Sequence, residues 1–176
     1  MNRPVAKPRS RDSIINYVQN IKKRLRYDGL GFPVCTFIEN IIQAIDPNFS
    51  YEYVENSELP ENTYAYYDPI NNIMKIDENV YCRALKGSPR DIFTIAHEIG
   101  HYFLVDEIAF ARSENEKIPA YMDPEWQANT FAAELLMPSD KILGMSIGEI
   151  MRTCHVSKTA AGIAHKNAKK PNYFLQ

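Results

Sequence analysis

The stretch that decides the fold runs from Pro89 to Leu104 and has the sequence PRDIFTIAHEIGHYFL. On a helix, the four-residue spacing of His97 and His101 places both imidazoles on one face, where they can bind one zinc ion. Zinc with three protein ligands and one open position makes water nucleophilic near neutral pH. Glu98, next to His97, is the candidate general base. These residues predict a zinc site that hydrolyses peptide bonds.

The signals for the ends and the burial of this helix agree with one another. Ser88 is placed to act as the N-cap, Pro89 is suited to the first helical position, and Asp91 falls in the first turn. Apolar residues then surround most of the circumference, which predicts a helix buried inside the domain. Gly100 costs about 1 kcal/mol relative to alanine in a helix interior. We interpret it either as room for a close neighbour or as simple tolerance.

A third ligand is expected downstream, in a second helix predicted between Asp123 as N-cap and Pro138 as terminator. This segment offers two carboxylates, Glu125 and Glu134. At about 100° per residue they lie on opposite faces, so at most one can reach the metal.

The neighbours of the two carboxylates favour Glu125 as the ligand. Small residues share its side of the helix and would allow a close approach to the histidine helix. Glu134 lies within a polar stripe with Gln127 and Thr130, so we expect a surface residue or a helix-end partner. Asn129, one turn after Glu125, is either a hydrogen-bond acceptor that orients a ligating histidine or an ordinary polar residue.

Two blocks of this sequence, from Phe93 to His101 and from Glu125 to Pro138, together resemble the ImmA/IrrE family of metallopeptidases. The resemblance implies a compact gluzincin, a zinc peptidase whose third ligand is a glutamate. The family motif maps one zinc ion onto His97, His101 and Glu125, and the base onto Glu98. It further implies a protein substrate, a helix-turn-helix repressor, whose cleavage switches mobile-element or stress-response genes.

The expected fold class is α+β and zincin-like. A small antiparallel sheet should pack on the histidine helix, followed by the second ligand-bearing helix and C-terminal helices. We expect residues 1–11 to be a disordered basic leader, 12–140 the peptidase domain, and 141–176 a helical extension packed on the same domain. A length of 176 residues with 45% hydrophobic content suits one domain of this kind.

Smaller elements complete the expected organisation. Helices are predicted from about residue 14 to 28, over 33–45, and as two short helices joined by a turn within 147–168. Strands are predicted over 50–55, 63–67 and 72–77, with a hairpin at 68–71. The strand containing Ile73, Lys75 and Asp77 is the candidate to pair with an extended substrate, unless it is an ordinary sheet edge. Residues 106–122 are expected to connect over the cleft as a possible lid.

The distribution of charge and the cysteines limit which kinds of function the sequence supports. The net charge of −2 combines +7 over residues 1–26, +5 over 141–176 and −14 between them. Basic ends could bind nucleic acid, but we favour packing or solubility roles.

Cys35, Cys82 and Cys154 are odd in number and widely spaced, which argues against disulfides and thiolate zinc sites. With neither a signal peptide nor a membrane-spanning apolar run, the expected location is the cytoplasm.

Three functional hypotheses remain at this point. The first is a zinc endopeptidase that cleaves a specific protein. The second is a metal-bound regulator or toxin–antitoxin component that acts by binding a partner or DNA; the short helices within 147–168 resemble a helix-turn-helix superficially. The third gives His97 and His101 only structural roles. Glu98 favours the first, because a protein that only binds needs no base beside its metal. Tyr102 and Tyr121 are both candidates for an oxyanion donor, and the spacing selects neither.

Overall fold

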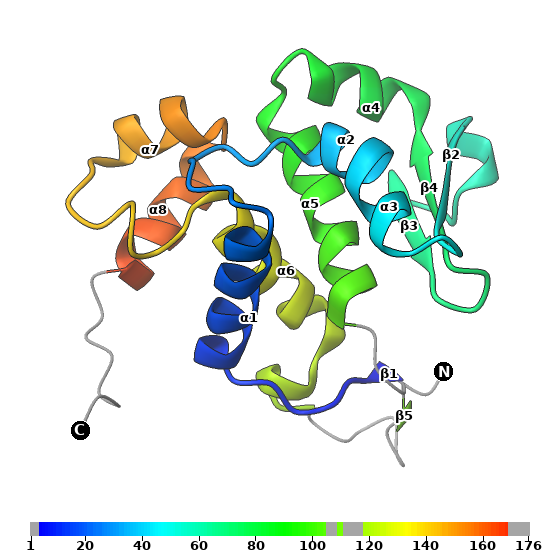
Figure 1. Cartoon of the computed structure of the whole chain (residues 1–176), viewed down its shortest axis with the longest axis horizontal. Helices are drawn as coiled ribbons and strands as arrows, with labels where there is room; N and C mark the ends of the chain where they lie inside the picture. Colours follow the sequence, from blue (N-terminus) through cyan, green and yellow to red (C-terminus); the bar gives the residue numbers. More distant parts are fainter. Residues whose placement is uncertain (1–3, 105–108, 111–117, 169–176) are drawn as a thin grey trace.

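The computed structural model describes residues 4–104, 109–110 and 118–168. It has an α+β architecture in which a three-stranded sheet lies at one end and two short C-terminal helices at the other, with the longer helices α1, α5 and α6 between them (Figure 1). The helical elements are α1 (Arg11–Arg24), α2 (Val34–Thr36), the π-helix η1 (Phe37–Ile42), α3 (Gln43–Ile45), the 3₁₀ turn η2 (Asn56–Glu58), α4 (Glu78–Leu85), α5 (Pro89–Leu104), the 3₁₀ turn η3 (Ala120–Met122), α6 (Pro124–Leu136), α7 (Ile147–Cys154) and α8 (Lys158–Ala168).

Helices α5 and α6 pack side by side and have the predicted ends. The backbone N–H of Ile92 donates to the carbonyl of Ser88, and the Asp123 side chain caps α6 by accepting from the backbone N–H of Glu125. Gly100 does provide room for a neighbour. A Cβ atom there would lie 3.0 Å from the carbonyl oxygen of Ala128 and 3.1 Å from its Cα atom. Glycine therefore lets the two helices approach backbone to backbone.

The sheet contains β2 (Ser50–Val54), β3 (Ala65–Asp68) and β4 (Ile73–Asp77) in the order β2-β4-β3. The predicted hairpin is confirmed, because β3 and β4 pair antiparallel. The expectation of an antiparallel sheet was wrong: β2 pairs parallel with β4, since the connection after β2 carries the chain across to the far edge before the hairpin begins.

The choice of substrate-pairing strand was also wrong. The strand with Ile73, Lys75 and Asp77 is β4, which is central and has both edges paired. The fully buried side chains of Met74 and Ile76 agree with a central position. In the described part of the chain, β3 has a strand on one side only and contacts α5.

The N-terminal segment differs from the predicted disordered leader over residues 4–10. β1 (Pro4–Val5) pairs with β5 (Ala109–Phe110), and the Gln127 side chain donates a 2.8 Å hydrogen bond to the carbonyl of Lys7. Backbone N–H groups of Ala6 and Arg9 bond to the carbonyls of Met122 and Tyr121. Composition suggested disorder, but these contacts with η3 and α6 hold the segment.

The C-terminal part forms the two predicted short helices, with His155 in the left-handed conformation (φ 52°) at the end of α7. Ile150, Cys154, Val156 and Ala161 join the same hydrophobic core as α5 and α6. All three cysteines are free thiols. Within the described residues, no helix combines the length and apolarity needed to cross a membrane. The predicted lid over 106–122 falls largely on residues 105–108 and 111–117, outside the described part.

Candidate metal centre

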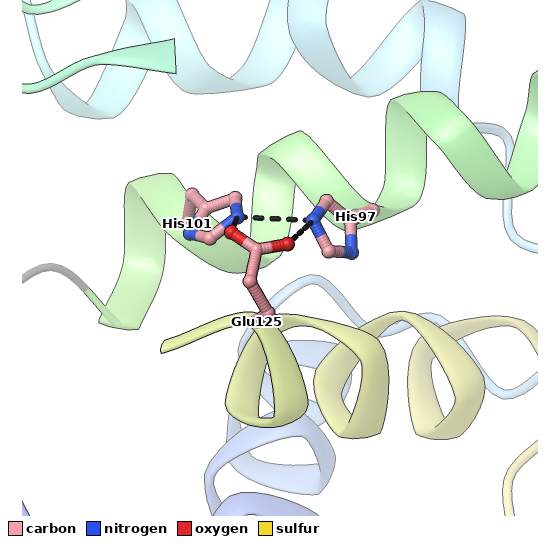
Figure 2. Close-up of side chains that lie close together, drawn as sticks. All are labelled: His97, His101 and Glu125. Carbon is pink, nitrogen blue, oxygen red and sulfur yellow. Dashed lines mark hydrogen bonds and ion pairs between the residues drawn. The ribbon is translucent and has the colours of Figure 1, made fainter. Parts of the chain in front are cut away.

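Three potential ligand atoms meet where α5 faces the first turn of α6 (Figure 2). His97 Nε2 lies 3.2 Å from Glu125 Oε2, and His101 Nε2 lies 3.3 Å from Glu125 Oε1. The two Nε2 atoms are 3.0 Å apart. All three residues come from the two predicted helices, so the structure brings together the three side chains that the sequence selected.

The chemistry and spacing of these atoms fit a zinc ion. Zn–N and Zn–O bonds of about 2.0–2.1 Å in a tetrahedron separate neighbouring ligand atoms by about 3.3 Å. The two Nε2 atoms lie 3.0 Å apart, and each lies 3.2–3.3 Å from one oxygen of the Glu125 carboxylate, which is close to this value. Two neutral imidazole nitrogens facing each other would repel unless a proton or a cation lies between them. Two nitrogens and a carboxylate oxygen form a donor set that zinc accepts.

The local electrostatics favour a cation at this position. The side chains of His97 and His101 are 16% and 19% exposed, whereas Glu125 is 66% exposed, so the site can be reached from solvent. Hydrogen bonds from His101 and His97 hold the pKa of Glu125 well below its usual range. Burial lowers the pKa of His97, but the bond to Glu125 and the charges of Glu98 and Glu125 raise it by more, so the net shift is upward.

Asn129 lies where it can orient His97. Its Oδ1 atom is 3.2 Å from His97 Nδ1. Because an amide oxygen can only accept, this contact places the imidazole proton on Nδ1 and leaves the Nε2 lone pair free to bind a metal.

Glu98 points from α5 toward the sheet. Its side chain is buried, and Oε2 accepts a 2.9 Å hydrogen bond from the backbone N–H of Tyr67 in β3. Burial raises the pKa of this carboxyl group. The electrostatic effects of His101 and His97 oppose part of this upward shift. A carboxylate with a raised pKa next to a metal site suits proton transfer near neutral pH.

Glu134 is a correction to the sequence analysis. It is 3% exposed rather than on the surface, although it does act as a helix-end partner by accepting from the N–H and hydroxyl groups of Ser139. Burial raises its pKa to about 7. Gln127, from the same supposed solvated stripe, is 1% exposed. This face of α6 is covered by α1 and the N-terminal segment.

A polar network behind the site was not predicted. The Tyr102 hydroxyl donates to Asp46 (3.0 Å), the Asn72 amide donates to the same carboxylate oxygen (2.9 Å), and the Tyr67 hydroxyl donates to Asn72 (2.9 Å). The network ties the helix of His101 to the hairpin that contacts Glu98. Asp46, the hairpin residues Tyr67 and Asn72, and Tyr102 lie in three separate parts of the sequence, so no local signal could have grouped them. Tyr102 donates to Asp46 instead of pointing a free hydroxyl at the site.

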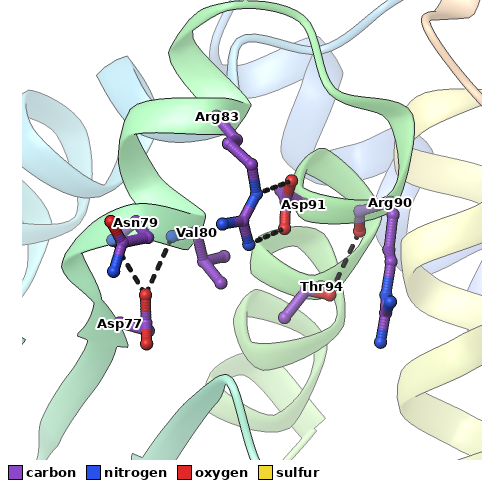
Figure 3. Close-up of polar contacts among 7 residues, drawn as sticks. All are labelled: Asp77, Asn79, Val80, Arg83, Arg90, Asp91 and Thr94. Carbon is purple, nitrogen blue, oxygen red and sulfur yellow. Dashed lines mark hydrogen bonds and ion pairs between the residues drawn. The ribbon is translucent and has the colours of Figure 1, made fainter. Parts of the chain in front are cut away.

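The start of α5 is fixed by a second set of contacts (Figure 3). Arg83 of α4 makes two hydrogen bonds, of 2.9 and 3.0 Å, to the buried carboxylate of Asp91. The side-chain bond from Arg83 lowers the pKa of Asp91. Asp77, at the end of β4, caps α4 through the N–H groups of Asn79 and Val80. The sheet, α4 and α5 are thereby held in a fixed arrangement around the site.

Comparison with known proteins gives a similar fold and a family. The chain is similar in fold to a Mycobacterium tuberculosis transcriptional regulator, with a TM-score of 0.56 and 13% identity over 92% of this chain and 48% of that one. The chain thus spans about half the length of that relative. No curated protein matches significantly. The profile of the M78 peptidases, described as the IrrE N-terminal-like domain, matches residues 56–163, which include His97, His101 and Glu125. Since this match covers more than half of the chain, the protein belongs to the M78 peptidase family.

Proposed function

We propose that this protein is a zinc-dependent endopeptidase with a zincin-like catalytic domain. His97, His101 and Glu125 hold one zinc ion, Glu98 is the general base, and Asn129 orients His97. The observation that supports this most is the convergence of two imidazole nitrogens and a carboxylate at separations of 3.0–3.3 Å, with a buried carboxylate beside them. Membership in the M78 peptidase family supports the same reaction class.

When bound, zinc would supply a Lewis acid that polarises the scissile carbonyl and makes water nucleophilic near neutral pH. Glu98 takes the proton from the attacking water and delivers it to the leaving nitrogen. Tyr67 donates its backbone N–H to Glu98 Oε2 and so fixes the direction of the carboxylate. β3, which has one strand neighbour among the described residues, pairs with the extended backbone of the substrate.

The substrate class follows from the family resemblance. We propose a protein substrate, specifically a helix-turn-helix repressor, cleaved in the cytoplasm to release mobile-element or stress-response genes. The fold likeness to a protein called a transcriptional regulator supports a role in transcription. It equally supports the second candidate, a metal-bound regulator that binds a partner or DNA without cleaving it.

Metal analysis tests the site directly. Wild-type protein, Glu125→Ala and Glu61→Ala are purified without added metal, and zinc per chain is measured by elemental analysis. Glu61 is an exposed carboxylate on the connection before β3 and serves as the matched control. We expect about one zinc per chain in the wild type and in Glu61→Ala, and a large loss in Glu125→Ala. A wild-type protein that retains no zinc even after zinc is added back would refute the proposal. Glu134→Ala is a poor control because Glu134 is buried and bonded to Ser139.

A further inference from the structure

A pocket of about 600 Å³ opens beside the candidate metal centre. Its walls come from three helices: the first half of α5, the second half of α6, and α8. The pocket and the metal centre share the Asn129 side chain, which lines the pocket and also contacts His97. The two features are therefore neighbours that meet at Asn129.

The helical repeat explains why the pocket and the metal centre are neighbours. Residues three or four apart lie on one side of a helix. On α5, Phe93 and Thr94 line the pocket, and His97 follows on the same side. On α6, the side that begins with Glu125 continues through Asn129 to Ala133. Because α5 and α6 lie side by side, the metal ligands and the pocket occupy neighbouring positions along one seam between them.

Helix α8 forms the third wall and is mainly apolar there. Ala160, Ile163 and Ala164 line the pocket opposite Phe93 and Met137. Ile163 is 58% exposed although it is a large apolar residue, so it presents apolar surface at the opening. The Glu134 carboxylate also lines the pocket, but Ser139 donates two hydrogen bonds to it. Arg11 and Arg90 also line the pocket.

We propose that this pocket binds the large apolar side chain of the substrate residue next to the scissile bond, and that α8 sets the size of side chain it accepts. The proposal rests on the proposed peptidase function for its substrate and on the pocket geometry for its chemistry. Pockets of about 300–1,000 Å³ with apolar walls and few polar groups are typical ligand sites. The proposal also gives α8 a role other than DNA contact, because side chains of α8 line the pocket together with those of α5 and α6.

Binding of N-acetylphenylalanine amide to zinc-free protein tests the pocket without requiring catalysis. Backbone ¹H–¹⁵N chemical shifts are followed during titration. We expect the largest shift changes at Ala133, Ala160 and Ile163, with weaker binding by about tenfold or more in Ala160→Phe, which fills the pocket. Ile163→Ala removes apolar wall at an exposed position and should also weaken binding without affecting folding. Ala44→Phe, an equal enlargement at an exposed position on α3, should bind like the wild type.

Cleavage of a proteome-derived peptide library by zinc-loaded protein gives the second readout. We expect large apolar residues on one side of the cleaved bond, and a shift of at least about tenfold toward Ala and Gly in Ala160→Phe. Absence of zinc would refute the peptidase function. The amide titration alone would then test whether the pocket binds apolar side chains. Shift changes that avoid the pocket, or amide affinities unchanged in both Ala160→Phe and Ile163→Ala, would overturn the pocket proposal even if peptides are cleaved.

Discussion

The Glu98 carboxylate accepts a hydrogen bond of 2.9 Å from the backbone N–H of Tyr67, which joins α5 to β3 on the side where, among the described residues, β3 has no strand neighbour. The bond directs one carboxylate oxygen to the strand and leaves the other available. In an antiparallel pair, alternate residues point their N–H and C=O groups away from the partner strand. Tyr67 is such a residue, so the edge proposed to bind substrate also positions the proposed base.

Glu98→Gln should abolish cleavage while the protein keeps its zinc. The glutamine amide oxygen can still accept from Tyr67, but it cannot take a proton from water. A general base contributes about 10²–10⁴-fold to rate, so we expect a loss in that range. Cleavage of a peptide library is followed by mass spectrometry, and zinc by elemental analysis. Glu61→Gln is the control. A Glu98→Gln protein that keeps its biological effect would instead support the regulator that acts by binding.

The helices that carry the site could be predicted because their signals are local. Pro89 and Pro124 mark helix starts, and the spacing of His97 and His101 fixes their common face whatever the tertiary structure. The choice of Glu125 over Glu134 also came from one helix considered by itself. Asn129 followed from its position one turn after Glu125. These inferences needed only the face of the helix on which each residue lies, and the structure brings both Glu125 and Asn129 into contact with His97.

Asn129→Ala should weaken zinc binding about 10–100-fold, the usual range for residues that orient a ligating histidine. Without the Oδ1 acceptor, the His97 ring loses its preferred proton position and orientation. Asn129→Asp keeps an acceptor and should retain affinity. Competition with a chromophoric chelator measures both, with Asn40→Ala, an exposed amide on the π-helix, as control. Equal affinities in Asn129→Ala and the wild type would show that the contact does not orient His97.

Features that depend on distant segments could not be predicted. Gln127 and Glu134 looked solvated because α6 carries polar groups on more than one face. The chain that covers Gln127 lies 120 residues away at Lys7. Strand order has the same difficulty: β2 and β4 pair in parallel across an intervening strand in the sequence. The pattern of apolar residues predicts where the strands lie in the sequence, but it does not indicate which strand is central in the sheet.

Glu134→Gln should remove a pH dependence of stability. Burial raises the pKa of Glu134 from its usual 4.5 to about 7 in the folded protein. The folded state then binds the proton more tightly than the unfolded chain. The contribution to stability is complete below pH 4.5 and is lost as the pH rises toward 7, by on the order of 1–3 kcal/mol.

Urea unfolding of zinc-free protein between pH 4.5 and 8 measures this effect as the difference between wild type and Glu134→Gln. Glutamine can still accept from Ser139 and does not ionise, so the variant should lose less stability over this range. Glu61→Gln should follow the wild type because Glu61 is exposed. Parallel stability curves for wild type and Glu134→Gln would show that Glu134 ionises normally in the folded state.

Gly100→Ala should destabilise the fold and weaken zinc binding together. The new Cβ atom would meet backbone atoms of Ala128 at 3.0 and 3.1 Å, and backbone cannot rotate away as a side chain can. Helices α5 and α6 must move apart, at a cost of about 1–3 kcal/mol, which separates His101 from Glu125.

Gly162→Ala is the matched control in α8, where no atom lies within 4 Å of the added Cβ. It should raise stability by about 0.5–1 kcal/mol through helix propensity and leave zinc affinity unchanged. Urea unfolding and chelator competition on both variants measure the two effects, and a Gly100→Ala protein as stable as Gly162→Ala would show that close packing of α5 on α6 is not required.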